Sequence, residues 1–151
     1  MMKLSRLAAH AVILVISLAS AAYARDLDRS DPDRAHILAA IHRLNDNDPN
    51  LKQYRYFVVD LVKDRNAAFV CAALADKNGG VEMTDDQAEI MTFALENRSP
   101  QWVATRLTGV GFAAGAQPLQ SDCRVNGRVV NTFADINAAL KSMGHKPFAS
   151  R

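Results

Sequence analysis

Apolar side chains recur at two spacings along the chain, and the change of spacing separates the expected helices from the expected strands. The first apolar group follows Ser30-Asp31-Pro32, which supplies a helix cap and a proline suited to the first turn. Its members fall on one face of a helix: Ile37, Leu38, Ile41 and Leu44. The polar run 45–50 interrupts this pattern. The sequence therefore predicts an amphipathic helix with one buried stripe.

Two strands are predicted next, because residues 54–62 are rich in aromatic and β-branched side chains. The polar residues 63–66 form a turn, and residues 67–75 are apolar throughout. The alanines of this second arm would also suit a helix, but Phe69-Val70-Cys71 after a tight turn favours a strand. A continuous apolar run indicates a central strand covered on both faces, with Cys71 inside.

A second hairpin is predicted from residues 88–96 and 101–109. Apolar and other residues alternate in the first segment, although its composition would also make a helix. The turn Asn97-Arg98-Ser99-Pro100 and the clear strand after it favour the hairpin. We expect residues 81–87 to be a loop or a short extension.

The segment 109–120 shows no period, and we expect a loop there. Its glycines Gly109, Gly111 and Gly115 lack the Gly-Lys-Ser/Thr ending of a phosphate-binding loop, so an irregular connection is the favoured interpretation. Asn126-Gly127 then predicts a two-residue hairpin turn.

The last predicted element is a helix that Thr132 caps together with Asp135, three residues later. Gly144 ends it in a left-handed conformation. Its apolar stripe has helical spacing: Phe133, Ile136, Leu140 and Met143. The whole pattern predicts an α+β fold, an antiparallel sheet of about four strands with an N-terminal and a C-terminal helix packed against it.

Residues 1–24 have the three regions of a secretory signal peptide. Lys3 and Arg6 precede an apolar stretch of about a dozen residues, shorter than the ~20 that span a membrane, and Ala22-Tyr23-Ala24 is a cleavage pattern. We expect cleavage after Ala24, which leaves residues 25–151 as a single small domain without stable membrane insertion. The alternative is an uncleaved anchor.

Loss of Lys3 and Arg6 leaves 16 basic residues against 16 acidic ones, so the mature chain is neutral. Without a basic block or a positive field, nucleic-acid binding is not expected.

Cys71 and Cys123 are both in the mature chain, and an even number of cysteines in an exported protein predicts a disulfide. The alternative is a pair of buried or reactive thiols. We expect the protein to be periplasmic or secreted.

Four segments together resemble a family of small uncharacterised bacterial periplasmic proteins. They are the helical run 37–41, the strand 57–62, the arm 66–70 and the strand 102–104. The resemblance spans residues 34–111 and rests on packing motifs. The chain departs from the family at Ala67, where an aromatic residue is common, and in the tail that carries Cys123. The resemblance implies export and brings no catalytic residue.

No constellation of side chains indicates catalysis, a cofactor or a metal, and we expect none of the three. His36 and His42 are six residues apart and fall on different helix faces. The acidic pairs Asp46/Asp48 and Asp85-Asp86 lie in polar loops, and the first lacks the central glycine and distal glutamate of a calcium loop.

Four further positions have an ordinary and a functional interpretation. Asp60 interrupts an apolar strand. The ordinary interpretation is an edge-facing or salt-bridged carboxylate, and the functional one is a buried acid. Trp102 is a core residue or a stacking platform. Arg55 and Arg106 either pair with Asp60 or Glu96 across strands or form an anion patch.

These observations favour an exported accessory or binding protein that acts through its surface, with an envelope protein as its expected partner. The alternatives are an inhibitor or immunity-type protein of an envelope hydrolase and a hydrolase with an unrecognised site.

Overall fold

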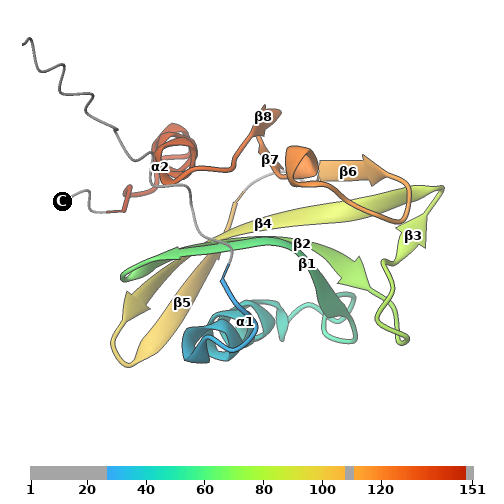
Figure 1. The fold of residues 1–151 in the computed structure, drawn as a ribbon, viewed down its shortest axis with the longest axis horizontal. Helices are drawn as coiled ribbons and strands as arrows, with labels where there is room; N and C mark the ends of the chain where they lie inside the picture. The colour runs from blue at the N-terminus through green and yellow to red at the C-terminus, as the bar shows by residue number, and fades with distance from the viewer. Residues whose placement is uncertain (1–26, 108–110, 149–151) are drawn as a thin grey trace, which may run out of the picture.

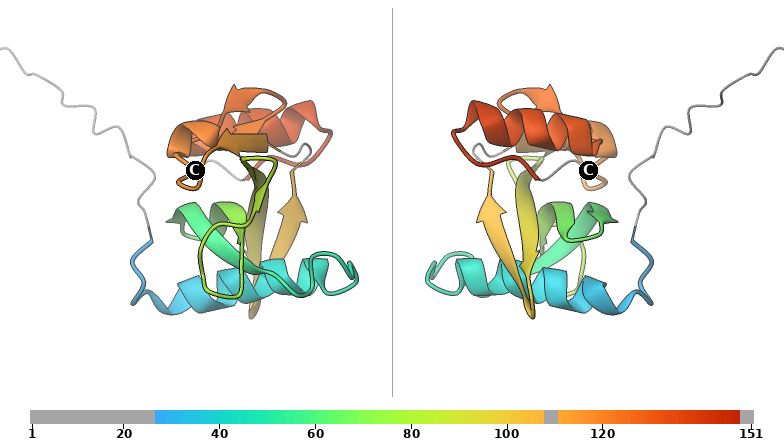
Figure 2. Two further views of the ribbon diagram at one scale, coloured as in Figure 1. Left: turned by 90° about the vertical axis from the view of Figure 1, so that its right-hand side faces the viewer. Right: turned by 90° about the vertical axis from the view of Figure 1, so that its left-hand side faces the viewer.

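The protein has an α+β fold in which an antiparallel sheet lies between two helical layers. The computed structural model describes residues 27–107 and 111–148. Helix α1 (Pro32–Asn45) covers one face of the sheet, and helix α2 (Phe133–Ser142) lies over the opposite face (Figures 1 and 2). The predicted fold class is confirmed, and both faces of the sheet are covered.

Four main strands form the sheet, and both predicted hairpins are present. Strands β1 (Arg55–Asp64) and β2 (Ala67–Ala75) make the first hairpin. Strands β4 (Gln87–Arg98) and β5 (Gln101–Arg106) make the second. Strand β2 pairs with β4 as well as β1, so it is central, as its apolar run predicted.

Two short strands extend the sheet, one within residues 81–87, where the sequence had indicated a loop or a short extension, and one within 109–120, where it had indicated a loop. Strand β3 (Met83–Thr84) pairs with the start of β4, and β6 (Gly111–Ala114) pairs with residues 87–90 of β4 on its other edge. The loop prediction for 109–120 is therefore wrong at 111–114. The reason is the length of β4, since β5 pairs only with its second half and leaves the first half open to β6.

Alternation along β2 divides the core into two clusters. Phe69, Cys71 and Ala73 face the cluster beneath α2, while Ala68, Val70 and Ala72 face the cluster beneath α1. All six are fully buried. A strand that is covered on both faces has no polar side to present, which explains why its sequence lacks a two-residue period.

Helix α1 begins where the sequence predicted, with Asp31 as its N-cap and Pro32 in the first turn. Ile37 and Ile41 are fully buried, but Leu44 is 41% exposed, so the predicted stripe is wrong at its last member. Asn45 is buried in its place, and its amide donates a hydrogen bond to the hydroxyl of Tyr56. The last turn therefore faces the sheet with a polar contact.

The C-terminal part forms a lobe over the sheet face opposite α1. It contains the 3-10 turn η1 (Gln120–Asp122) and a hairpin of β7 (Arg124–Val125) and β8 (Arg128–Val129) around Asn126-Gly127. The capping box of Thr132 and Asp135 starts α2, as predicted. Gly144 follows the helix with a φ of 76°.

The predicted signal peptide, residues 1–24, lies outside the described residues. Among the residues that are described, no helix is long and apolar enough to cross a membrane.

Candidate functional site

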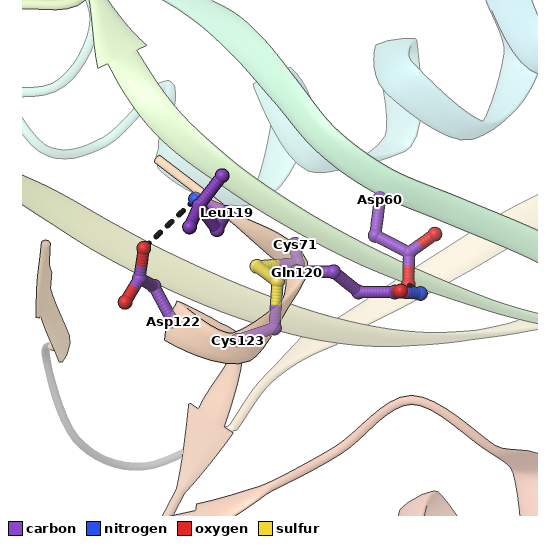
Figure 3. Close-up of a disulfide and its surroundings, with 6 residues drawn as sticks. All are labelled: Asp60, Cys71, Leu119, Gln120, Asp122 and Cys123. Atoms are coloured by element: carbon purple, nitrogen blue, oxygen red, sulfur yellow. Dashed lines mark hydrogen bonds between the residues drawn. A yellow bond between two sulfur atoms is a disulfide. The ribbon is translucent and has the colours of Figure 1, made fainter. Parts of the chain in front are cut away.

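A disulfide joins Cys71, in the middle of β2, to Cys123, directly after η1 (Figure 3). The two Cα atoms are 5.8 Å apart and both residues are fully buried. The predicted bridge is confirmed. It ties the C-terminal lobe to the central strand, and such a bond suggests an oxidising, extracytoplasmic compartment.

Asp60 lies beside this disulfide because β1 contains a bulge. The register shifts between Val58 and Asp60, so Asp60 is opposite Cys71. Its side chain is 5% exposed and accepts a hydrogen bond of 2.9 Å from the Gln120 amide (Figure 3). The carboxyl group is therefore buried, which was the alternative interpretation of the sequence, and does not face the edge of the sheet. The sequence could not show this, because a bulge changes which face a residue occupies.

Thr92 of β4 extends this row, since it is opposite Cys71 on the other side of β2. Its hydroxyl is buried and has no hydrogen-bond partner among the described residues. The row therefore places a carboxylate, a disulfide and a hydroxyl on three adjacent strands beneath the C-terminal lobe. Their burial makes the row part of the core rather than a solvent-accessible site.

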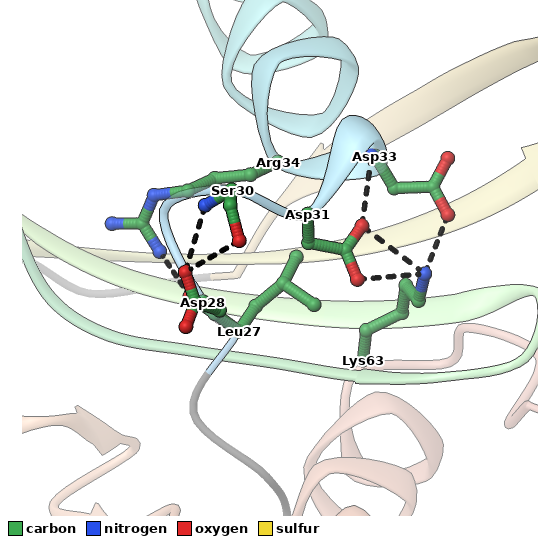
Figure 4. Close-up of polar contacts among 7 residues, drawn as sticks. All are labelled: Leu27, Asp28, Ser30, Asp31, Asp33, Arg34 and Lys63. Carbon is green, nitrogen blue, oxygen red and sulfur yellow. Dashed lines mark hydrogen bonds and ion pairs between the residues drawn. The ribbon is translucent and has the colours of Figure 1, made fainter.

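The start of α1 is fixed to β1 by charge (Figure 4). The Lys63 ammonium lies 2.5 Å from a carboxylate oxygen of Asp33 and 3.5 Å from Asp31. The hydrogen bond from Lys63 lowers the pKa of Asp33, and the same bond raises the pKa of Lys63. Arg34 donates to the carbonyl of Leu27, whose own amide donates to the Leu61 carbonyl of β1. These contacts attach the first described residues to the sheet.

The remaining candidates from the sequence are dispersed. His36 and His42 are exposed, and His42 contacts the ring of Tyr56 at 5.0 Å between centroids. Burial of that ring raises the pKa of the Tyr56 hydroxyl. Trp102 is 3% exposed, which confirms its core role. Among residues 27–107 and 111–148, no group of three His, Cys, Asp or Glu is placed to hold a metal ion.

The two arginines proposed as an anion patch are not neighbours. Arg55 is on β1 and Arg106 on β5, with β2 and β4 between them. Arg106 lies 3.6 Å from Glu89 of β4, whereas Glu96 pairs with Arg98. Cross-strand pairing is therefore confirmed for Arg106, but with Glu89 in place of the expected partner.

A cleft of about 500 Å³ lies at the open end of the β1–β2 hairpin, where β1 begins and β2 ends. The connection from α1 to β1 and the turn from β2 to β3 form its walls. Ala75 is buried at its base. Its polar lining consists of Gln53, Tyr54, Arg55, Asp76, Lys77, Asn78 and Glu82. The sequence did not predict the cleft, because the lining residues come from three polar segments that show no motif. The only signal was that these three segments lie at the ends of predicted strands.

The sheet also has open edges, and they differ in character. The outer edge of β1 carries the bulge, the charged Lys63 and the contact from Leu27. At β5, Arg43 of α1 donates to the Trp102 carbonyl. Among the strands of the described residues, β6 pairs with β4 alone, and the turn η1 contacts it near Gly111. Strand β6 has the uncharged sequence Gly-Phe-Ala-Ala and exposes 61% of Phe112. Leu119, shortly after β6, is 64% exposed.

Comparison of the chain with protein-family models, with curated proteins and with solved structures finds no match.

Proposed function

We propose that this protein is an exported binding protein, periplasmic or secreted, that acts through contacts with another envelope protein. The buried Cys71–Cys123 disulfide carries the proposal, because such bonds persist in oxidising compartments and are rare in the cytosol. The signal-peptide pattern of residues 1–24 supports the same location.

The β6 edge is the part of the surface best suited to such a contact. Natural proteins protect sheet edges with charges, bulges or covering segments, and β1 and β5 have these features. Strand β6 has neither a charge nor a bulge, although the turn η1 contacts it near Gly111. A partner strand that pairs with the rest of β6 would have Phe112 as an apolar anchor. Because β6 is short, the contact is expected to be weak and transient.

The location is tested with a reporter fusion and with thiol labelling of the native chain. An exported protein shows reporter activity outside the cytosol and no free thiol until it is denatured and reduced. A chain recovered from the cytosol with intact N-terminal residues and reduced cysteines would overturn the proposal.

The binding surface is tested by capture from an envelope extract with three versions of the protein. Phe112→Ser removes the exposed anchor, whereas Val103→Ser changes an exposed apolar residue of β5 as a matched control. We expect one partner to be retained by the wild type and by V103S and lost with F112S. Equal capture by all three would exclude the β6 edge. If the partner is a lytic enzyme that loses activity when bound, the protein is an inhibitor.

A further inference from the structure

The cleft at the end of the β1–β2 hairpin holds charged side chains that the fold itself does not use. The side chains of Arg55, Lys77 and Glu82 have no hydrogen bond or ion pair to any other described residue. Three charged pairs lie elsewhere on the sheet and α1: Lys63 with Asp33, Arg98 with Glu96, and Arg106 with Glu89. The side chains of Gln53 and Tyr54 likewise have no polar partner in the described parts of the chain. Free groups of both signs thus line one cavity.

The frame of the cleft is fixed, although its rim is polar. One carboxylate oxygen of Asp76 accepts hydrogen bonds from the amides of Asn78 at 2.8 Å and Gly80 at 2.9 Å, which closes the turn after β2. The backbone amide of Asp76 also donates to the Gly80 carbonyl. Tyr54 packs against the core cluster beneath α1. A rigid turn and a packed ring limit the ordering that a ligand has to impose.

Strand pairing brings the charged residues together. Arg55 is opposite Ala75 in the β1–β2 register, and Lys77 follows Ala75 by two residues. On the other side of β2, Ala75 forms a bridge with Val81, and the Glu82 amide donates to the Leu74 carbonyl. The cations therefore come from β1 and the turn after β2, and the carboxylate comes from the segment that returns beside them.

We propose that this cleft binds a short zwitterionic peptide. The ligand carboxylate would lie with Arg55 and Lys77, its ammonium group with Glu82, and its small apolar side chains against Ala75 and the Tyr54 ring. Guanidinium and ammonium groups bind a carboxylate through charge-assisted hydrogen bonds. A simple anion fits less well because the carboxylates Asp76 and Glu82 oppose it. The volume of about 500 Å³ is within the usual range of small-molecule sites.

A second cavity, of about 390 Å³, lies between the β7–β8 hairpin and α2, and it lacks this property. Its carboxylate, Asp135, accepts the hydrogen bond of Thr132, and its hydroxyl, Ser142, donates to the Ala139 carbonyl. Free charges of both signs distinguish the first cleft from the second.

The test is a titration of the isotope-labelled, oxidised protein recovered after export, followed by NMR. The probes are L-alanyl-L-alanine, its N-acetyl form without the ammonium group, and its C-terminal amide without the carboxylate. We expect the free dipeptide to bind with a dissociation constant of about 1 mM and to shift signals of residues 53–55 and 75–82. Each blocked form is expected to bind about tenfold more weakly.

Variants of the cleft assign the two charges. Arg55→Gln/Lys77→Gln removes the cations that would hold the ligand carboxylate, so the free dipeptide and its C-terminal amide should bind this variant equally weakly. Glu82→Gln removes the partner of the ligand ammonium group, so the free dipeptide and its N-acetyl form should bind that variant equally weakly. Lys141→Gln/Lys146→Gln removes two exposed cations outside the cleft and should leave all three affinities unchanged.

Three results would overturn the proposal. The first is the absence of NMR shifts at a dipeptide concentration 20 times the expected dissociation constant, on the order of 20 mM. The second is equal affinity for the free and the blocked dipeptides. The third is tighter binding of a neutral disaccharide or of inorganic phosphate than of the free dipeptide. Since Phe112 and the β6 edge do not line this cleft, failure here leaves the proposed protein contact unaffected, and failure of that contact leaves the cleft unaffected.

Discussion

Gln120 donates its side-chain amide to the buried carboxylate of Asp60, 60 residues earlier in the chain, at 2.9 Å. The contact joins the C-terminal lobe to the bulge of β1, next to the disulfide. A hydrogen bond to a buried carboxyl group is worth more than one at the surface, because removal of the donor leaves the buried group with a desolvation penalty.

Loss of this bond is therefore measurable. We expect Gln120→Ala to lower the free energy of unfolding by about 1–2 kcal/mol in urea denaturation, because Asp60 stays buried with one donor fewer. Gln117→Ala is the matched control, since that side chain is exposed and has no polar partner among the described residues; its effect should stay below about 0.5 kcal/mol. Equal effects of the two changes would show that the bond contributes nothing.

Removal of the disulfide should cost more. Cys71 and Cys123 are 52 residues apart, and for a loop of that length the chain-entropy model gives about 4 kcal/mol as an upper value. We expect Cys71→Ala/Cys123→Ala to lose roughly 3–4 kcal/mol in urea denaturation of the oxidised and variant proteins. An unchanged urea midpoint would contradict the role of the bridge as the tie between lobe and sheet.

The ion pair at the start of α1 predicts a pH dependence. The pKa of Asp33 is lowered from 3.8, so its contribution is present above that pH and disappears as the pH falls through the lowered value. The pKa of Lys63 is raised from 10.5, so its contribution is present below that pH and disappears as the pH rises through the raised value. The pair thus stabilises the fold across the range between the two.

The measurement is the stability of Lys63→Met relative to wild type as a function of pH. Because Lys63 and Asp33 are 22% and 35% exposed, we expect a difference of only about 0.5–1 kcal/mol near neutral pH, which shrinks below 3.8 and above 10.5. Arg65→Met, which removes a more exposed pair with Asp64, should have a smaller effect at every pH. A pH-independent difference would show that Lys63 acts through its aliphatic stem.

The turn between β3 and β4 is expected to be improvable. Asp85 and Asp86 have φ values of 51° and 60°, where asparagine and glycine are favoured. We expect Asp85→Asn/Asp86→Gly to raise the free energy of unfolding by about 1 kcal/mol.

The opposite effect is expected for Gly127→Ala in the β7–β8 turn, which should lower the free energy of unfolding by about 1 kcal/mol. The cause is the backbone conformation, since φ is 76° at Gly127, and not a steric clash, since a Cβ atom there would meet nothing within 4 Å. Thermal denaturation of both variants gives the comparison.

Trp102 and Val103 provide a paired test of the core on the α1 side. Trp102 is 3% exposed and Val103 is 39% exposed, although they are adjacent on β5. In urea denaturation, Trp102→Ala should lower the free energy of unfolding by roughly 3–5 kcal/mol, whereas Val103→Ala should lower it by less than about 0.5 kcal/mol. Similar losses for both would place Trp102 outside the core.

The sequence predicted the elements that carry their own local signals. Asp31 and Pro32 marked the start of α1, Thr132 and Asp135 that of α2, and Asn126-Gly127 the last hairpin. These signals succeed because a cap or a tight turn is satisfied by residues a few positions apart. The disulfide was predicted from an even number of cysteines in a chain expected to be exported, and two cysteines allow only one pairing.

The features that the sequence did not predict depend on distant partners. Strand β6 forms because half of β4 is unpaired, and nothing within residues 111–114 reports this. The bulge at Val59 decides that Asp60 faces the disulfide, and Asn45 takes the place of Leu44 because Tyr56 is within reach. The cleft likewise requires three separate polar segments to meet. Each of these outcomes is set by tertiary packing.

The alternation of β2 makes its length intolerant of change. Insertion or deletion of one residue before Cys71 would rotate every later side chain of the strand to the opposite face. The sulfur would then point toward α1, out of reach of Cys123, and the large and small residues of the two layers would be exchanged. Insertions and deletions of single residues should therefore be tolerated in the loops around the sheet. Within residues 67–75 they should prevent the protein from folding.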